Sequence, residues 1–160
     1  MNNLQKKKAI IWDWNGTLLN DTDICIESMN LLLQKRNHPV LTKDRYREIF
    51  TFPVRDYYIK AGFNFESEPL DLIALEFMDL YFSKLPEANI FREVWQVLST
   101  FQGSKIKQVL ISAMEHEALV NSVKEKGLFK FFNYISGIQD HFAAGKTENA
   151  KKIVKELNLN

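Results

Sequence analysis

The order of apolar and polar residues predicts one strand, then a helical block, then alternating strands and helices. Ala9-Ile10-Ile11-Trp12 is a continuous apolar run that ends at Asp13 and the turn former Gly16. A run of this length indicates a strand buried on both faces. Residues 22–85 instead repeat their apolar positions at helical spacing. The chain therefore changes from strand to helix within the first 22 residues.

The helical block divides into four predicted helices, separated by proline and glycine. The expected segments are 22–36, 42–50, the stretch from Pro53 to Gly62, and 67–85 with Pro69 in its first turn. Asp21 or Thr22, Thr42 and Ser67 are the expected N-terminal caps, because short polar side chains accept hydrogen bonds from the first free N–H groups.

The second half alternates between the two kinds of element. We expect a helix over 91–101, a strand over 107–112, a helix over 115–126, a strand over 134–136 and a helix over 147–157. Such alternation is typical of an α/β fold with a doubly wound parallel sheet. Residues 1–20 and 87–160 would form this core, and residues 21–86 would be a small helical cap inserted after the first strand, near the carboxyl ends of the strands where such sheets bind ligands.

Composition narrows the possible partners and surroundings. The 160 residues include 21 basic and 20 acidic side chains, a formal net charge of +1, which gives no electrostatic footprint for nucleic acid. The apolar runs are too short to cross a membrane. Cys25 is the only cysteine, which excludes an intramolecular disulfide and fits a reducing compartment. We expect a cytoplasmic protein with a small-molecule or protein partner.

The candidate chemistry starts at Asp13, at the end of the first strand. A carboxylate there would be held rigidly in the ligand crevice, Gly16 allows a sharp turn, and Thr17 offers a hydroxyl and a backbone amide to an anion. Asp, Asn and Gly are also common in turns, so the string Asp13-Trp14-Asn15-Gly16-Thr17-Leu18 has a second interpretation as a simple strand-ending turn.

This string resembles the first signature of the haloacid dehalogenase superfamily. The resemblance implies that Asp13 attacks phosphorus and becomes an aspartyl phosphate, with Gly16 and Thr17 binding substrate. Ser112 resembles the second motif, which binds the transferring phosphoryl group, and Ala113 beside it would also contact substrate. Alone, Ser112 would more simply be a helix cap.

The third motif of the family supplies a lysine, and Lys146 resembles it. An ammonium group at the start of a helix can stabilise Asp13 and neutralise charge on the phosphoryl oxygens. Alone, Lys146 would be an ordinary surface lysine. The resemblance is closest to phosphoglycolate-phosphatase-like members with a helical cap, and Arg55 is the cap residue expected to touch an anionic substrate, with an exposed helix charge as the simpler interpretation.

Asn15 departs from the family pattern, which has an aspartate at this position as general acid and base. An amide cannot exchange a proton at neutral pH, so assistance worth typically ~10²–10⁴-fold should be missing. Acyl phosphates and other substrates with good leaving groups would suffer least. His38, His116 and His141 are conceivable substitutes outside the motif. The resemblance also implies that Mg²⁺ binds Asp13 and the main-chain carbonyl of Asn15.

The acidic pair of the fourth motif is the second departure, because no matching strand and acidic loop follow before Asn160. With one protein carboxylate, Mg²⁺ would bind weakly. The Ile10-Ile11 strand would also lie at a sheet edge, which is an association hazard. We expect either a fragment of a longer protein or a truncated variant that covers this edge as a homodimer.

Two functions follow from these expectations. The first is a Mg²⁺-dependent phosphatase that hydrolyses a small phosphorylated metabolite, a phosphate monoester, through an aspartyl phosphate. The second is a degenerate member that binds a phosphorylated ligand or a protein partner with little or no turnover, which Asn15 and the missing acidic pair favour.

Overall fold

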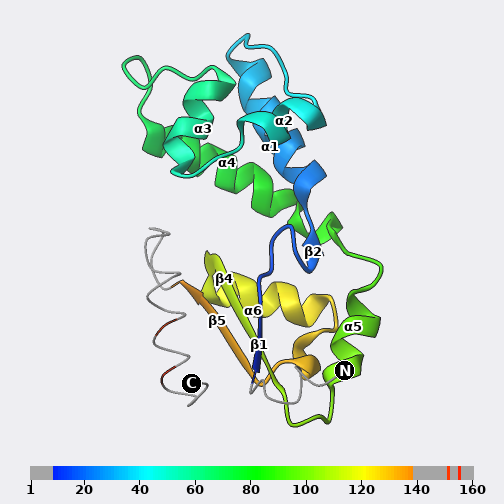
Figure 1. The fold of residues 1–160 in the computed structure, drawn as a ribbon. Helices are drawn as coiled ribbons and strands as arrows, with labels where there is room; N and C mark the ends of the chain where they lie inside the picture. Colours follow the sequence, from blue (N-terminus) through cyan, green and yellow to red (C-terminus); the bar gives the residue numbers. More distant parts are fainter. Residues whose placement is uncertain (1–8, 139–150, 152–154, 156–160) are drawn as a thin grey trace. The chain divides into compact units, whose positions relative to one another are not determined.

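The computed structural model describes residues 9–138 together with Lys151 and Lys155 (Figure 1). It divides the chain into two compact units, residues 1–20 with 89–160 (unit 1) and residues 21–88 (unit 2). The polypeptide thus passes twice between the units. No described helix is long and apolar enough to cross a membrane.

Unit 1 is built on a parallel sheet of three described strands. The strand order is β1-β4-β5, and its strands and helices are β1 Ala9–Trp12, α5 Val94–Phe101, β4 Lys107–Glu115, α6 His116–Glu125 and β5 Tyr134–Ile138, with a short 3₁₀ turn at Phe129–Phe131. Two short strands, β2 Leu19–Asn20 and β3 Asn89–Ile90, pair antiparallel. The α/β class with a parallel sheet and helices is confirmed.

The core of unit 1 forms because β4 is apolar on both faces. Its Val109, Leu110 and Ile111 are buried, as are Leu119 and Val123 of α6. α6 packs on β4 and β5, while α5 contacts β4. Burial of both faces explains why β4 has a continuous apolar run in place of alternation.

β1 lies at one edge of the three described strands, with β4 as its neighbour. The parallel register places Ile10 beside Gln108 and Trp12 beside Leu110. Ile11 is 47% exposed, which is unusual for a strand made only of apolar residues. An apolar edge of this kind agrees with the expectation from sequence.

Unit 2 is a helical unit with its own core. Its helices are α1 Thr22–Lys35, α2 Lys43–Ile49, α3 Val54–Ala61 and α4 Leu70–Lys84, followed by a 3₁₀ turn at Leu85–Glu87. The buried cluster takes residues from all four helices and the loops, namely Met29, Leu32, Leu33, Leu41, Ile49, Tyr57, Tyr58, Ala61, Phe63 and Ile73. From the fourth helix, Leu70, Phe77 and Leu80 also pack against this cluster.

The helix caps agree only in part with the sequence prediction. Thr42 caps α2 as expected, with its hydroxyl accepting from the Arg45 N–H at 3.1 Å. The prediction for Ser67 is wrong, because α4 begins after Pro69 and the Ser67 hydroxyl donates to the Asn64 carbonyl at 2.9 Å. Asp21 holds the cap position of α1 without a side-chain cap bond.

Two other boundaries also differ. The helix expected from residue 91 begins at Val94, because the Phe91 N–H donates to the Leu18 carbonyl at 3.0 Å and so extends the β2–β3 pairing. The strand expected to end at Ser112 continues to Glu115 through an irregularity in its pairing with β5. Such a bulge redirects the side chains near the end of a strand.

Asp21 instead belongs to a small buried polar group at the start of α1. Its carboxylate accepts a hydrogen bond from the Tyr81 hydroxyl of α4 at 2.7 Å and lies 3.9 Å from the Cys25 sulfur. Burial, followed by the charge of Asp21, raises the pKa of the Cys25 thiol to about 12. The single cysteine is therefore protonated at neutral pH, which makes it a poor nucleophile.

Arg36 links the end of α1 to α4 and the segment before it. Its Nε and Nη2 bind the two Glu68 oxygens, both at 2.6 Å, and Nη2 also binds Glu76 at 2.7 Å. The hydrogen bond from Arg36 lowers the pKa of Glu68, and hydrogen bonds from Lys35 and Arg36 lower the pKa of Glu76.

We predict that Arg36→Ala destabilises unit 2 by about 1–3 kcal/mol at pH 7, with the lower value set by solvent screening around Glu68. The folded-state pKa values of both carboxyls are lowered, so their contribution is present above the unfolded pKa of about 4.3 and is lost as the pH falls below it. Urea unfolding followed by circular dichroism should show a smaller difference between the variant and the wild type at pH 4 than at pH 7.

Arg47→Ala is the matched control, because Arg47 makes an exposed pair with Asp44 at 3.7 Å. Its effect should stay within about 0.5 kcal/mol. Equal losses in the two variants would contradict the role assigned to Arg36.

Candidate active site

The carboxyl ends of β1, β4 and β5 meet at one edge of the sheet in unit 1, because the strands are parallel and in register. Asp13 follows β1 at this edge, and Ser112 lies near the end of β4. Open α/β sheets bind ligands at such an edge. The fold therefore brings two of the predicted site residues together from positions 99 residues apart.

A tight turn follows Asp13 and is closed on the carbonyl of Trp14. This oxygen accepts from the N–H groups of Thr17 at 3.2 Å, Leu18 at 2.9 Å and Leu19 at 2.9 Å. Gly16 has a φ of +68°, a conformation that glycine adopts without steric penalty, and its N–H donates to the Leu19 carbonyl at 2.9 Å.

These bonds change the expectation for Thr17. Its N–H already donates within the turn, so the hydroxyl is the group that Thr17 has left to offer an anion. Thr17 and Gly16 are both exposed beside Asp13. The positions suit substrate contact, and their role stays a prediction.

Asp13 itself is half-buried, and its Oδ1 accepts the N–H of Trp14 at 2.9 Å. This bond orients the carboxylate relative to the turn. The Trp14 ring is fully buried, and its Nε1 donates to the Ser122 hydroxyl of α6 at 3.3 Å. This anchoring role of Trp14 was not predicted, although a large aromatic residue inside an otherwise polar turn is a signal of it.

Ser112 and Asn15 are joined by a hydrogen bond. Ser112 is 1% exposed, and its hydroxyl donates to Asn15 Oδ1 at 3.3 Å while accepting from the Met114 N–H at 3.0 Å. The bond connects the turn after β1 to β4. Ser112 is thus placed beside the Asp13 turn, and its binding of a phosphoryl group stays a prediction.

The simpler interpretation of Ser112 as a helix cap is wrong. The cap of α6 is Glu115, whose two carboxylate oxygens accept from the N–H groups of Glu117 and Ala118, both at 2.9 Å. These backbone hydrogen bonds lower the pKa of Glu115. A carboxylate also suits the positive end of the helix dipole.

His116 begins α6 and is held against β5. Its Nδ1 accepts from the Gly137 N–H at 3.3 Å. Gly137 has no space for a side chain, since a Cβ there would lie 2.4 Å from the Met114 carbonyl and 2.7 Å from the His116 Cα. The close approach fixes the path of the backbone after Ser112.

The other predicted site residues and conceivable substitutes lie in unit 1, in unit 2 or outside the described residues. Ala113 is exposed beside Ser112, as substrate contact requires. Arg55 is exposed on α3 of unit 2, with its guanidinium carbon 5.2 Å from the centroid of the Phe65 ring. Lys146 lies outside the described residues, as does His141. His38 lies in unit 2 with its ring 6.1 Å from that of Phe63.

The described side chains do not form a complete metal site. Within residues 9–138 and the two described lysines, no three His, Cys, Asp or Glu side chains are grouped as a metal ion would require. Mg²⁺ is usually held by one or two carboxylates plus waters and substrate phosphates. Asp13 and the Asn15 carbonyl alone do not fit a complete magnesium site.

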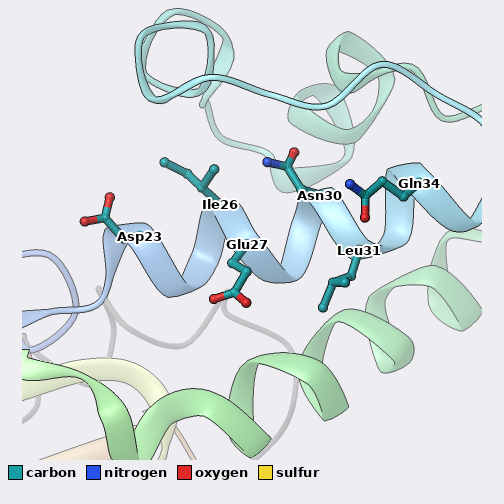
Figure 2. A pocket seen from close by; sticks show the side chains of 6 residues that line it. All are labelled: Asp23, Ile26, Glu27, Asn30, Leu31 and Gln34. Atoms are coloured by element: carbon teal, nitrogen blue, oxygen red, sulfur yellow. The ribbon is translucent and has the colours of Figure 1, made fainter.

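A surface pocket occurs elsewhere, along one face of α1 in unit 2 (Figure 2). Its six lining residues are Asp23, Ile26, Glu27, Asn30, Leu31 and Gln34. Asp23 and Glu27 already pair with Lys43 and Lys84, both at 2.7 Å. Because the pocket contains none of the predicted site residues, we place the candidate site at the sheet edge of unit 1.

Comparisons with known proteins agree with this geometry. A family model described as haloacid dehalogenase-like hydrolase matches residues 10–160. A haloacid dehalogenase-like hydrolase from Streptococcus pneumoniae is similar, with a TM-score of 0.80 and 16% identity over 97% of this chain and 72% of that one. A search of curated proteins finds no match.

Two further structures share the fold. One is described as a predicted phosphoglycolate phosphatase from Haemophilus somnus, with a TM-score of 0.75 and 13% identity over 96% of this chain and 72% of that one. The other is described as a predicted phosphatase from Clostridium acetobutylicum, with a TM-score of 0.77, 16% identity and the same coverage. At these identities the likeness establishes the fold.

We predict that Gly137→Ala destabilises unit 1 by about 2 kcal/mol or more, because the new methyl group must displace backbone at Met114 and His116. Thermal unfolding measures the loss. Gly103→Ala is the control: Gly103 has a φ of +77° and open space around it, so the change should be limited to about 1 kcal/mol of backbone strain. A loss no greater than that of the control would contradict the close approach.

Proposed function

Because the chain belongs to the haloacid dehalogenase-like hydrolase family, we propose that it is a phosphohydrolase with Asp13 as its nucleophile. The observation that supports this best is the turn closed on the Trp14 carbonyl, which holds Asp13 at the carboxyl end of β1 beside Ser112. The proposed substrate is a small phosphate monoester.

In the proposed reaction a carboxylate oxygen of Asp13 attacks phosphorus in line with the leaving oxygen. The bond from phosphorus to that oxygen breaks, an aspartyl phosphate forms, and water then releases inorganic phosphate. The Trp14 N–H orients the carboxylate through its 2.9 Å bond to Oδ1. Correct orientation of the attacking group removes much of the entropic barrier.

The remaining residues are assigned to the phosphoryl group and the substrate. Ser112 and Lys146 would bind the phosphoryl oxygens. Gly16, Thr17 and Ala113 would contact substrate from the sheet edge, and Arg55 from unit 2. Unit 2 would act as the cap, with residues 21–86 as its proposed bounds. Closure of such an element excludes water from the reaction.

Mg²⁺ is typical of the family, and we propose it as the cofactor on that ground. Asp13 and the Asn15 carbonyl are its proposed ligands. The described residues supply an incomplete set, so weak binding is expected. A cytoplasmic location and a homodimer are likewise proposals.

A second candidate function rests on Asn15. Its amide occupies the position beside Asp13 where the resemblance implies an acid and base, and Ser112 donates to its oxygen. An amide cannot transfer a proton. The competing proposal is a protein that binds a phosphorylated ligand or a partner with little or no turnover.

We predict that Asn15→Asp raises the steady-state release of phosphate from alkyl phosphate monoesters by ~10²–10⁴-fold, since it restores proton transfer. Asp13→Asn should abolish release because the amide is not nucleophilic. Phosphate release from a panel of small phosphate monoesters, with Mg²⁺ present, measures both variants.

Asp44→Asn is the matched control, because Asp44 is a highly exposed carboxylate on α2 in unit 2 and its loss should leave the rate unchanged. Full activity in Asp13→Asn would show that the nucleophile is wrongly assigned. Substrate-analogue binding without release in both the wild type and Asn15→Asp would support the binding function.

A further inference from the structure

Two side chains at the carboxyl end of β4 that could accept a proton, Glu115 and His116, are engaged by the backbone. Both oxygens of Glu115 accept backbone N–H groups at the start of α6, and these bonds lower its pKa, which makes it a weak base. Nδ1 of His116 accepts from the Gly137 N–H. The two carboxylate oxygens of Glu115 and Nδ1 of His116 thus accept hydrogen bonds from the local backbone.

Asn15 and Ser112 cannot fill this role either. Ser112 has one hydroxyl proton, which it donates to Asn15 Oδ1 at 3.3 Å, and its oxygen accepts from the Met114 N–H at 3.0 Å. The amide of Asn15 is neutral and has no basic nitrogen. The side chains of Asn15 and Ser112 therefore supply no base that could remove a proton from water.

We infer that phosphorylated Asp13 is a long-lived state of this protein, formed from acyl phosphates and hydrolysed slowly. This inference rests on the proposed function, because it requires Asp13 to be the nucleophile. It adds the class of phosphoryl donor and the rate-limiting step.

The donor class follows from the leaving group. Attack of Asp13 on an acyl phosphate breaks the bond between phosphorus and the acyl oxygen, and the electron pair leaves on a carboxylate. A carboxylate, whose acid has a pKa of about 4, departs without a proton. An alkoxide is about as basic as hydroxide, the conjugate base of water with a pKa of 15.7, and so requires a proton donor. Acyl phosphates should thus transfer their phosphoryl group to Asp13 faster than alkyl phosphate monoesters do.

The slow step follows from the same chemistry. Hydrolysis of the aspartyl phosphate adds water, breaks the bond between phosphorus and the Asp13 oxygen, and releases inorganic phosphate and one proton. With the neutral amide of Asn15 at the position where the family has an acid and base, that proton passes to solvent or to phosphate. Loss of general base catalysis slows such a step by ~10²–10⁴-fold.

The test mixes the full chain and Mg²⁺ with acetyl phosphate and follows the intact mass and the acetate and phosphate released. We expect one phosphoryl group per chain, lost on treatment with hydroxylamine, and a rapid release of one acetate per chain before a slow steady state. Asn15→Asp should shorten the lifetime of the phosphorylated chain by ~10²–10⁴-fold. Asp13→Asn should gain no phosphoryl group.

The outcomes separate this inference from the proposed function. Phosphorylation of Asp13 followed by hydrolysis as fast in the wild type as in Asn15→Asp would overturn the long-lived state and leave the nucleophile intact. A phosphoryl group that forms equally well in Asp13→Asn, or forms in neither the wild type nor Asn15→Asp, would overturn both. Equal rates of phosphorylation by acetyl phosphate and by alkyl phosphates would overturn the donor class.

Discussion

The arrangement of the candidate site depends on how Trp14 is held. Its carbonyl closes the turn by accepting three N–H groups, its N–H orients Asp13, and its ring is buried with Nε1 on Ser122. Both the backbone and the side chain of Trp14 are thus held by hydrogen bonds. Asp13, the proposed nucleophile, is attached to this residue, and a restricted carboxylate is what in-line attack requires.

Local patterns in the sequence predicted most of the fold. β1, β4 and the helices of unit 2 follow directly from the sequence. A strand buried on both faces has a continuous apolar run, and a helix buried on one face repeats its apolar residues at helical spacing. Caps were less predictable. Ser67 and Glu115 show why. A polar side chain near a helix start can bond to several neighbouring backbone groups, and the backbone conformation determines which bond forms.

The sequence predicted which residues lie at the candidate site, but it did not predict the hydrogen bonds and close contacts between them. Asp13 and Ser112 follow from strands that end at one sheet edge, whereas the bond from Ser112 to Asn15 joins residues 97 apart in sequence. Gly137 was also missed, because its requirement comes from the backbone of Met114 and His116 after the β4 bulge. Such tertiary approaches leave no local pattern in a single sequence.

Order and reactivity are separate properties at this sheet edge. The hydrogen bonds of Ser112, Glu115 and His116 order the backbone at the end of β4, at the start of α6 and on β5, and those of Glu115 and His116 occupy atoms that could accept a proton. A rigid nucleophile beside the neutral amide of Asn15 would favour the first half of the proposed phosphoryl-transfer reaction over the second. In the proposed reaction, the balance between transfer to Asp13 and release to water therefore depends on Asn15, because it lies within the turn and a carboxylate there would supply proton transfer.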